Sequence, residues 1–90
     1  MLRIQRAQQG DTVVLALSGG LAEEYVAELQ RVVAAETGEL VLDLHELTRV
    51  TRDAVKLLAE LEAAGARLLG PPEYLRQWIS KERGLSVDRG

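Results

Sequence analysis

The 90-residue sequence contains no cysteine, no phenylalanine and only one histidine. A chain without cysteine forms no disulfide and no thiolate metal site, and it has no cysteine nucleophile. The single histidine, His45, has no second metal ligand and no nucleophile at a suitable spacing. We therefore predict no metal site, no cofactor and no catalytic residue, and we interpret His45 as a turn residue whose ring is hydrogen-bonded.

Aromatic residues and long apolar runs are also scarce, and acidic residues outnumber basic ones. One tryptophan and two tyrosines are the only aromatic residues, so the core of a small single domain must consist of leucine, valine and alanine. The net charge of −3 argues against binding to duplex nucleic acid, which normally requires a basic face. No apolar run approaches the ~20 residues of a membrane span, and the N-terminus lacks the apolar segment of a signal peptide. We expect a cytoplasmic protein that neither inserts into a membrane nor binds nucleic acid.

The most informative part of the sequence begins at Leu40. The first five residues are apolar apart from Asp43, which predicts a strand covered on at least one face. From Asp53 onward apolar side chains recur every three or four residues, which predicts a helix that ends at Gly65. A short strand at 66–69 completes a βαβ unit, whose crossover is almost always right-handed.

The connector of this unit, residues 45–52, joins the carboxyl end of the first strand to the amino end of the helix. Thr51 or Asp53 is predicted to cap that helix by accepting a hydrogen bond from a free backbone N–H. We expect the connector to lie at the surface, which makes it the candidate functional segment of the chain.

The flanking segments add two strands before the βαβ unit, a helix leading into it and a helix after it. Gly10 suits a tight turn, Gly19-Gly20 is expected to end the second strand, and Gly84 to end the last helix. We therefore predict one domain at 1–84. The expected order is strand 1–7, strand 12–18, helix 21–36, strand 40–44, helix 53–64, strand 66–69 and helix 73–83, followed by a frayed tail or edge strand at 85–90.

These elements predict a mixed four-stranded sheet with all the helices packed on one face. The first two strands form an antiparallel hairpin, and right-handed crossovers make the later strands parallel. The alternation of side chains along a strand places Leu40, Leu42 and Leu44 toward the helices. The second face, partly in water, is expected to carry Arg3, Val14, Ala16, Val41, Asp43, His45 and Arg67.

The segment 40–69, LVLDLHELTRVTRDAVKLLAELEAAGARLL, resembles the STAS domain family. It shares with that family an apolar strand ending in Asp-Leu, a turn, a helix of small and leucine residues, a glycine, and a strand that closes at Gly-Pro-Pro. The family includes bacterial anti-sigma factor antagonists and the cytoplasmic tails of sulfate transporters. The resemblance covers nearly all of 2–83 and implies an α/β fold of the order β-β-α-β-α-β-α.

The chain departs from the family at the turn that carries its phosphoacceptor. That turn usually reads Asp-Ser-Ser-Gly or Asp-Thr-Gly-Gly, and its first Ser or Thr is phosphorylated by a partner kinase. Thr51, Arg52, Asp53 and Ala54 occupy the four positions, and none of them matches. The resemblance therefore implies an anti-sigma factor antagonist-like protein without the usual serine. Thr51 is the remaining candidate for phosphorylation, with helix capping as the alternative.

The substituted turn has its own charge pattern. Arg52 places a permanent positive charge where the family carries its acceptor, and Lys56 follows one helical turn later. These charges would suit an acidic partner surface; the alternative is that they form a solvated helix edge. The candidate partner-binding residues are Thr48, Thr51, Arg52, Asp53 and Lys56.

Three functions remain open from the sequence. The leading hypothesis is a non-enzymatic regulatory domain that binds an anti-sigma factor or a serine kinase of the ATPase type, as the resemblance implies. The second is a STAS subunit that stabilises the ATPase of a lipid-transport ABC complex. The third, a nucleotide-binding protein or small hydrolase, has the least support because Gly19-Gly20 lacks a third glycine and a phosphate-loop lysine. A homodimer could form through the second sheet face or the exposed edge strand.

Overall fold

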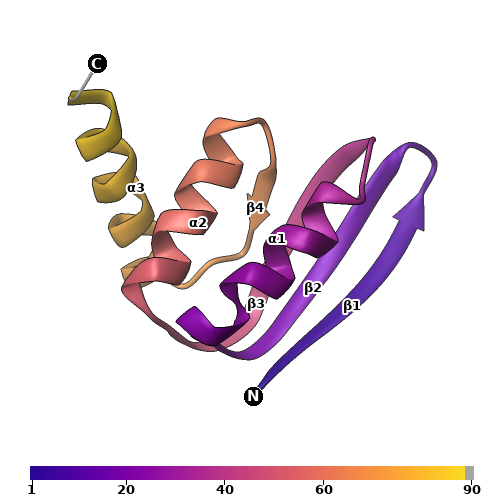
Figure 1. Ribbon diagram of the computed structural model, residues 1–90, viewed down its shortest axis with the longest axis horizontal. Coiled ribbons are helices and arrows are strands. Elements are labelled where there is room, and N and C mark those ends of the chain that lie inside the picture. Colours follow the sequence, from indigo (N-terminus) through magenta and orange to yellow (C-terminus); the bar gives the residue numbers. More distant parts are fainter. Residues whose placement is uncertain (89–90) are drawn as a thin grey trace.

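The computed structural model describes residues 1–88 of the chain, with four strands in one sheet and helices over one side of it (Figure 1). The elements in order are β1 (Leu2–Gln9), β2 (Thr12–Leu21), the 3-10 helix η1 (Glu23–Tyr25), α1 (Val26–Ala34), β3 (Glu39–Val50), α2 (Arg52–Ala63), β4 (Arg67–Leu69) and α3 (Glu73–Asp88).

The sheet has the strand order β1-β2-β3-β4. β1 and β2 are antiparallel and are joined through Gly10, whose φ of 61° suits a residue without a side chain. β2, β3 and β4 are parallel neighbours, each connected to the next through a helix. The predicted mixed sheet and its pairing are confirmed.

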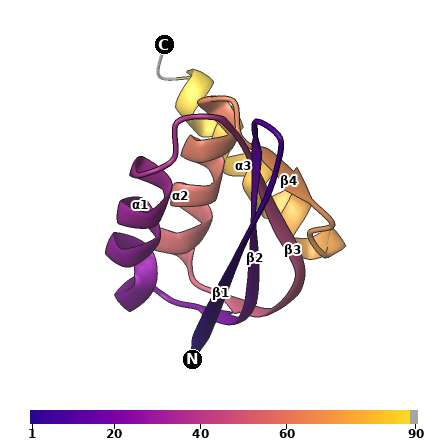
Figure 2. The same ribbon diagram turned by 90° about the vertical axis from the view of Figure 1, so that its right-hand side faces the viewer.

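The core lies between the sheet and the helices. Leu15 of β2, Leu42 and Leu44 of β3 and Leu58 of α2 are fully buried. α1 and α2 lie along one side of the sheet (Figure 2). α3 packs against α2, and the same core includes its residues Leu75 and Ile79. Within residues 1–88 no helix lies on the opposite face of the sheet, as the alternation of residues predicted.

The end of β2 differs from the sequence-based expectation. Gly19-Gly20 does not break the strand, which continues to Leu21, and the helix expected at 21–36 is replaced by η1 and the shorter α1. Gly19 instead allows the start of the chain to lie against β2: it has φ 91°, and a Cβ there would overlap the Met1 carbonyl oxygen. The Gly20 N–H donates a hydrogen bond of 3.0 Å to that same oxygen.

The connector expected at 45–52 is largely strand. β3 continues to Val50, and only Thr51 separates it from α2. Two register shifts against β2, each with one extra residue in β3, accompany this extension. Because of these shifts, the buried positions Leu44, Leu47 and Val50 recur every three residues instead of every two. A strand that is identified by strict alternation of buried and exposed residues is therefore missed here.

The last helix also extends beyond its expected end. α3 passes through Gly84 and continues to Asp88, so the tail or edge strand expected at 85–90 is wrong for 85–88. The remaining expected tail positions, 89–90, lie outside the described residues. The interior of a helix tolerates a glycine at a cost of about 1 kcal/mol, which packing elsewhere along α3 can offset.

Candidate docking surface

The candidate residues lie where β3 ends and α2 begins. Thr48, Arg52, Asp53 and Lys56 are exposed, and Thr51 is partly buried. β3 brings Thr48 to the rim of the sheet, while the first two turns of α2 carry the other three exposed residues. The structure therefore brings all five predicted residues to one end of the molecule.

Thr51 occupies the N-cap position of α2 but its side chain does not cap the helix. Its backbone is extended, with φ −90° and ψ 168°, and its hydroxyl makes no capping hydrogen bond. The Oγ1 atom is buried and has no hydrogen-bond partner among the described residues. The junction is held instead by the backbone, since the Thr51 N–H donates to the Leu21 carbonyl (3.1 Å) and the Val55 N–H donates to the Thr51 carbonyl (2.9 Å). The expected hydroxyl cap is therefore wrong.

We predict that Thr51→Val raises the free energy of unfolding by about 0.5–1 kcal/mol, because it replaces an unpaired buried hydroxyl with a methyl group of similar size. A capping threonine would behave oppositely, since losing its bond costs about 1 kcal/mol. Urea denaturation followed by circular dichroism measures the change, with Thr51→Ser, which keeps the hydroxyl, as the control. A destabilised Thr51→Val protein would show that the hydroxyl does cap α2.

Arg52 connects the candidate surface to α3. Its Nε lies 3.7 Å from Oε2 of Glu82, whose side chain is only 10% exposed, whereas the Arg52 side chain is 66% exposed. A second ion pair, between Arg83 and Glu62 at 3.2 Å, joins the same two helices. Arg52 therefore has two roles: it lies near a buried carboxylate and presents its guanidinium to solvent.

The sequence analysis did not single out Glu82. A signal was present, because Glu82 follows Leu75 and Ile79 at seven and three residues and so lies on the buried stripe of α3. A charged residue on such a stripe needs a nearby partner of opposite charge. Among the residues with described side chains, Arg52 is the only cation that forms an ion pair with it.

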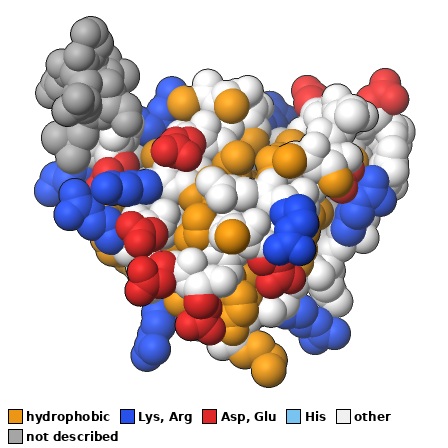
Figure 3. Space-filling model, viewed as in Figure 1, with side chains coloured by type: hydrophobic (Ala, Val, Ile, Leu, Met, Phe, Trp, Pro, Cys, Tyr) orange, Lys and Arg blue, Asp and Glu red, His pale blue; other side chains and the backbone are white. Residues whose placement is uncertain are grey.

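Lys56 is the second cation of the surface. It is exposed, and none of the ion pairs within the described part of the chain includes it. The wider helix face does not have a single sign of charge, since basic and acidic side chains are mixed over it (Figure 3). Attraction for an acidic partner would therefore be local to the start of α2.

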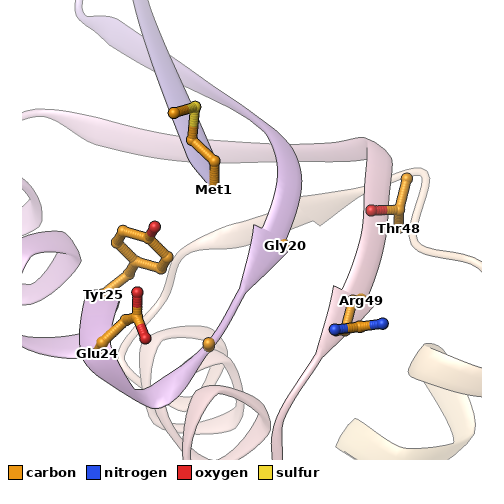
Figure 4. Close-up of a pocket in the computed structure, with 7 residues that line it drawn as sticks. Met1, Gly20, Glu24, Tyr25, Thr48 and Arg49 are labelled. Atoms are coloured by element: carbon orange, nitrogen blue, oxygen red, sulfur yellow. The ribbon is translucent and has the colours of Figure 1, made fainter.

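A shallow pocket adjoins the candidate surface. It measures about 480 Å³ and is lined by Met1, Gly20, Ala22, Glu24, Tyr25, Thr48 and Arg49. Glu24 and Tyr25 lie on one side of the β2 end, and Thr48 and Arg49 on the other (Figure 4). The sequence analysis did not identify Arg49, because the register shifts that expose it are not visible in the residue pattern. The pocket extends the candidate surface across the carboxyl ends of β2 and β3.

His45 lies away from this surface, on the open face of the sheet. Its Nδ1 is 2.7 Å from Oδ1 of Asp43, and its backbone N–H donates to the same oxygen at 3.1 Å. The ring hydrogen bond, and next the backbone one, lower the pKa of the Asp43 carboxyl below its ordinary value. Their contribution to stability is present above the ordinary aspartate pKa and is lost as the pH falls through the depressed one. The expected hydrogen bond of the ring is confirmed, but the expected turn is wrong, because His45 lies within β3.

Solved structures share this arrangement of strands and helices. The anti-sigma factor antagonist SpoIIAA in its unphosphorylated form superposes with a TM-score of 0.69 at 19% identity, over 97% of this chain and 95% of SpoIIAA. A protein of the DUF3478 family from Shewanella loihica PV-4, with a SpoIIAA-like fold, gives a TM-score of 0.56 at 14% identity, over 93% of this chain and 78% of that one. The chain has the STAS fold.

The other comparisons give little further information about the chain. A structure of Mglu matches with a TM-score of 0.58 at 30% identity over 77% of this chain, but the match covers only 19% of Mglu. No family model matches the sequence, and no curated protein matches it. None of the helices within residues 1–88 has both the length and the apolar character of a membrane span.

Proposed function

We propose that this protein is a non-enzymatic regulatory domain that binds another protein through the end of β3 and the exposed side of α2. The surface consists of Thr48, Thr51, Arg52, Asp53 and Lys56. The observation that supports it best is the STAS fold over 97% of the chain, combined with exposed charged residues at the start of α2. By the resemblance, α2 of this fold begins at the phosphoacceptor turn.

The charges favour an acidic partner surface. Arg52 keeps most of its side chain in solvent despite its contact with Glu82, and Lys56 lies one turn further along α2. Asp53 between them offsets part of their charge, so the attraction is short-ranged and falls with ionic strength. The resemblance suggests an anti-sigma factor or a serine kinase of the ATPase type as the partner.

Binding through this surface would be constitutive. Arg52 occupies the acceptor position and carries no hydroxyl, and the hydroxyl of the neighbouring Thr51 is buried. A kinase could reach Thr51 only after the start of α2 had opened. Intact mass of the protein purified from its native host tests this: we expect an unmodified chain, and a phosphate on Thr51 would instead make binding switchable.

We predict that Lys56→Glu weakens partner binding by about tenfold, because it places a carboxylate against an acidic surface while leaving no internal ion pair broken. Co-purification from the native host identifies the partner, and calorimetric titration of the purified pair then gives the affinity. Lys81→Glu makes the same charge change at an exposed position of α3 and is the control. Arg52→Ala is a weaker test, since it also removes the cation beside Glu82.

The outcomes of this experiment are distinct. Equal affinities of the wild type and the Lys56→Glu protein would place the docking surface elsewhere. Recovery of an ABC-transporter ATPase, in place of a kinase or an anti-sigma factor, would favour the alternative in which the domain stabilises a transport complex.

A further inference from the structure

The open face of the sheet has an arrangement that the proposed function does not use. β2 lies between β1 and β3 on this face, and the short β4 lies beyond β3. The strand pairing places each outward residue of β1 level with one of β2 and one of β3. The four rows are Arg3-Ser18-Glu46, Gln5-Ala16-Asp43, Ala7-Val14-Val41 and Gln9-Thr12-Glu39.

The two flanks of this face are chemically complementary, row by row. Where β1 presents a hydrogen-bond donor, as at Arg3 and Gln5, β3 presents a carboxylate, Glu46 or Asp43. The row at Gln9 repeats this, with Glu39 on β3. Where β1 presents the apolar Ala7, β3 presents Val41. The central positions on β2 are small or apolar, so they can pack against the same residues of a second copy of the chain.

A two-fold axis along β2 would use this complementarity. Such a rotation lays the open face of one copy on that of another, with β2 over β2 and β1 over β3. We propose that two copies of the chain associate face to face in this way. Arg3 of each copy then meets Glu46 of the other, and Val14 and Ala16 pack against their own counterparts.

The residues that would form the new ion pairs are available for them. Arg3 and Glu46 are exposed, and neither forms an ion pair within the part of the chain whose side chains are described. Asp43 and Glu39 are already hydrogen-bonded to His45 and Thr12, at 2.7 Å and 3.0 Å. Arg3 and Glu46 should therefore contribute most of the electrostatic attraction between copies.

The size of the face sets the strength of the association. Three strands about 4.8 Å apart and about 25 Å long give a contact smaller than the ~800 Å² per partner of a standard interface. Sheets pack about 10 Å apart, which small central side chains such as Ala16 permit. The dimer should therefore be weak, dependent on protein concentration, and further weakened by salt.

Sedimentation velocity over a concentration series tests the proposal. We expect Arg3→Glu and Glu46→Arg each to weaken self-association by about tenfold, because each change turns two attractive contacts into two repulsive ones. The double variant Arg3→Glu/Glu46→Arg should restore it. Arg67→Glu, on the same face but on β4 outside the overlapping strands, should leave it unchanged.

Several results would overturn the proposal. They are a chain that stays monomeric at every accessible concentration, a double variant that fails to regain self-association, and an Arg67→Glu protein weakened as much as Arg3→Glu. If two copies instead paired through their β1 edges, the Ala16→Asp protein would still self-associate, because Ala16 lies on the open face and not at that edge. Circular dichroism of each variant distinguishes lost association from lost folding. Lys56→Glu should not alter self-association, so this proposal and the α2 docking surface can fail independently.

Discussion

Replacing Leu44 with alanine should lower the free energy of unfolding by about 3 kcal/mol, as expected for a large side chain removed from a closed core. Leu44 is fully buried between β3 and the helices. It also lies at the first register shift of β3, between the paired residues Asp43 and Glu46 and ahead of Thr48 and the start of α2. The same change should therefore reduce the order of the proposed docking surface as well as the stability of the whole domain.

Val41 on the same strand provides the matched control. It lies on the open face, level with Val14 and Arg67, and is only partly buried. Val41→Ala should cost less than about 1 kcal/mol, since it removes two methyl groups that are already in contact with water. Urea denaturation at low protein concentration, where the proposed dimer is dissociated, measures both variants. Equal costs at positions 41 and 44 would contradict a core that lies on one side of the sheet.

The sequence could predict the sheet faces because their residues alternate strictly. Leu40, Leu42 and Leu44 share one side of β3 and are separated by Val41 and Asp43, so a period of two assigns both faces at once. The same argument holds for β2. The order of the strands follows from the short links and the right-handed crossover, which leave few other topologies.

The far ends of β2 and β3 could not be predicted in the same way. Glycines at 19 and 20 usually mark the end of a strand, but here they admit the Met1 carbonyl beside the sheet. That contact joins residues distant in sequence, which no local pattern records. The predicted connector at 45–52 does lead into α2, although most of it proved to be strand.

The sequence predicted that the candidate residues lie around the start of a helix, but not the contacts that they make. The resemblance to the STAS family located the start of α2 from the segment after Leu44. It could not show that the Thr51 hydroxyl faces inward without a partner, or that Arg52 lies beside Glu82 of α3. The Arg52–Glu82 contact depends on how α3 packs against α2, and both features depend on tertiary structure.

Replacing Gly70 with alanine should lower the free energy of unfolding by about 2–3 kcal/mol, through backbone strain and a steric overlap together. Gly70 connects β4 to α3 with φ 68°, a conformation that residues with a side chain rarely adopt. A Cβ at this position would overlap the His45 ring, which must then leave its hydrogen bond with Asp43. The backbone and the ring therefore contribute separately to the cost.

A double-mutant cycle with His45→Ala separates the two contributions. Without the imidazole, Gly70→Ala should cost only the ~1–2 kcal/mol of the left-handed backbone. The difference between the two backgrounds, about 1 kcal/mol, is the coupling between the ring and the glycine. Chemical denaturation of the four proteins measures it. A cost that is equal with and without His45 would mean that the ring does not rest against Gly70, and that backbone strain alone requires glycine where β4 passes into α3.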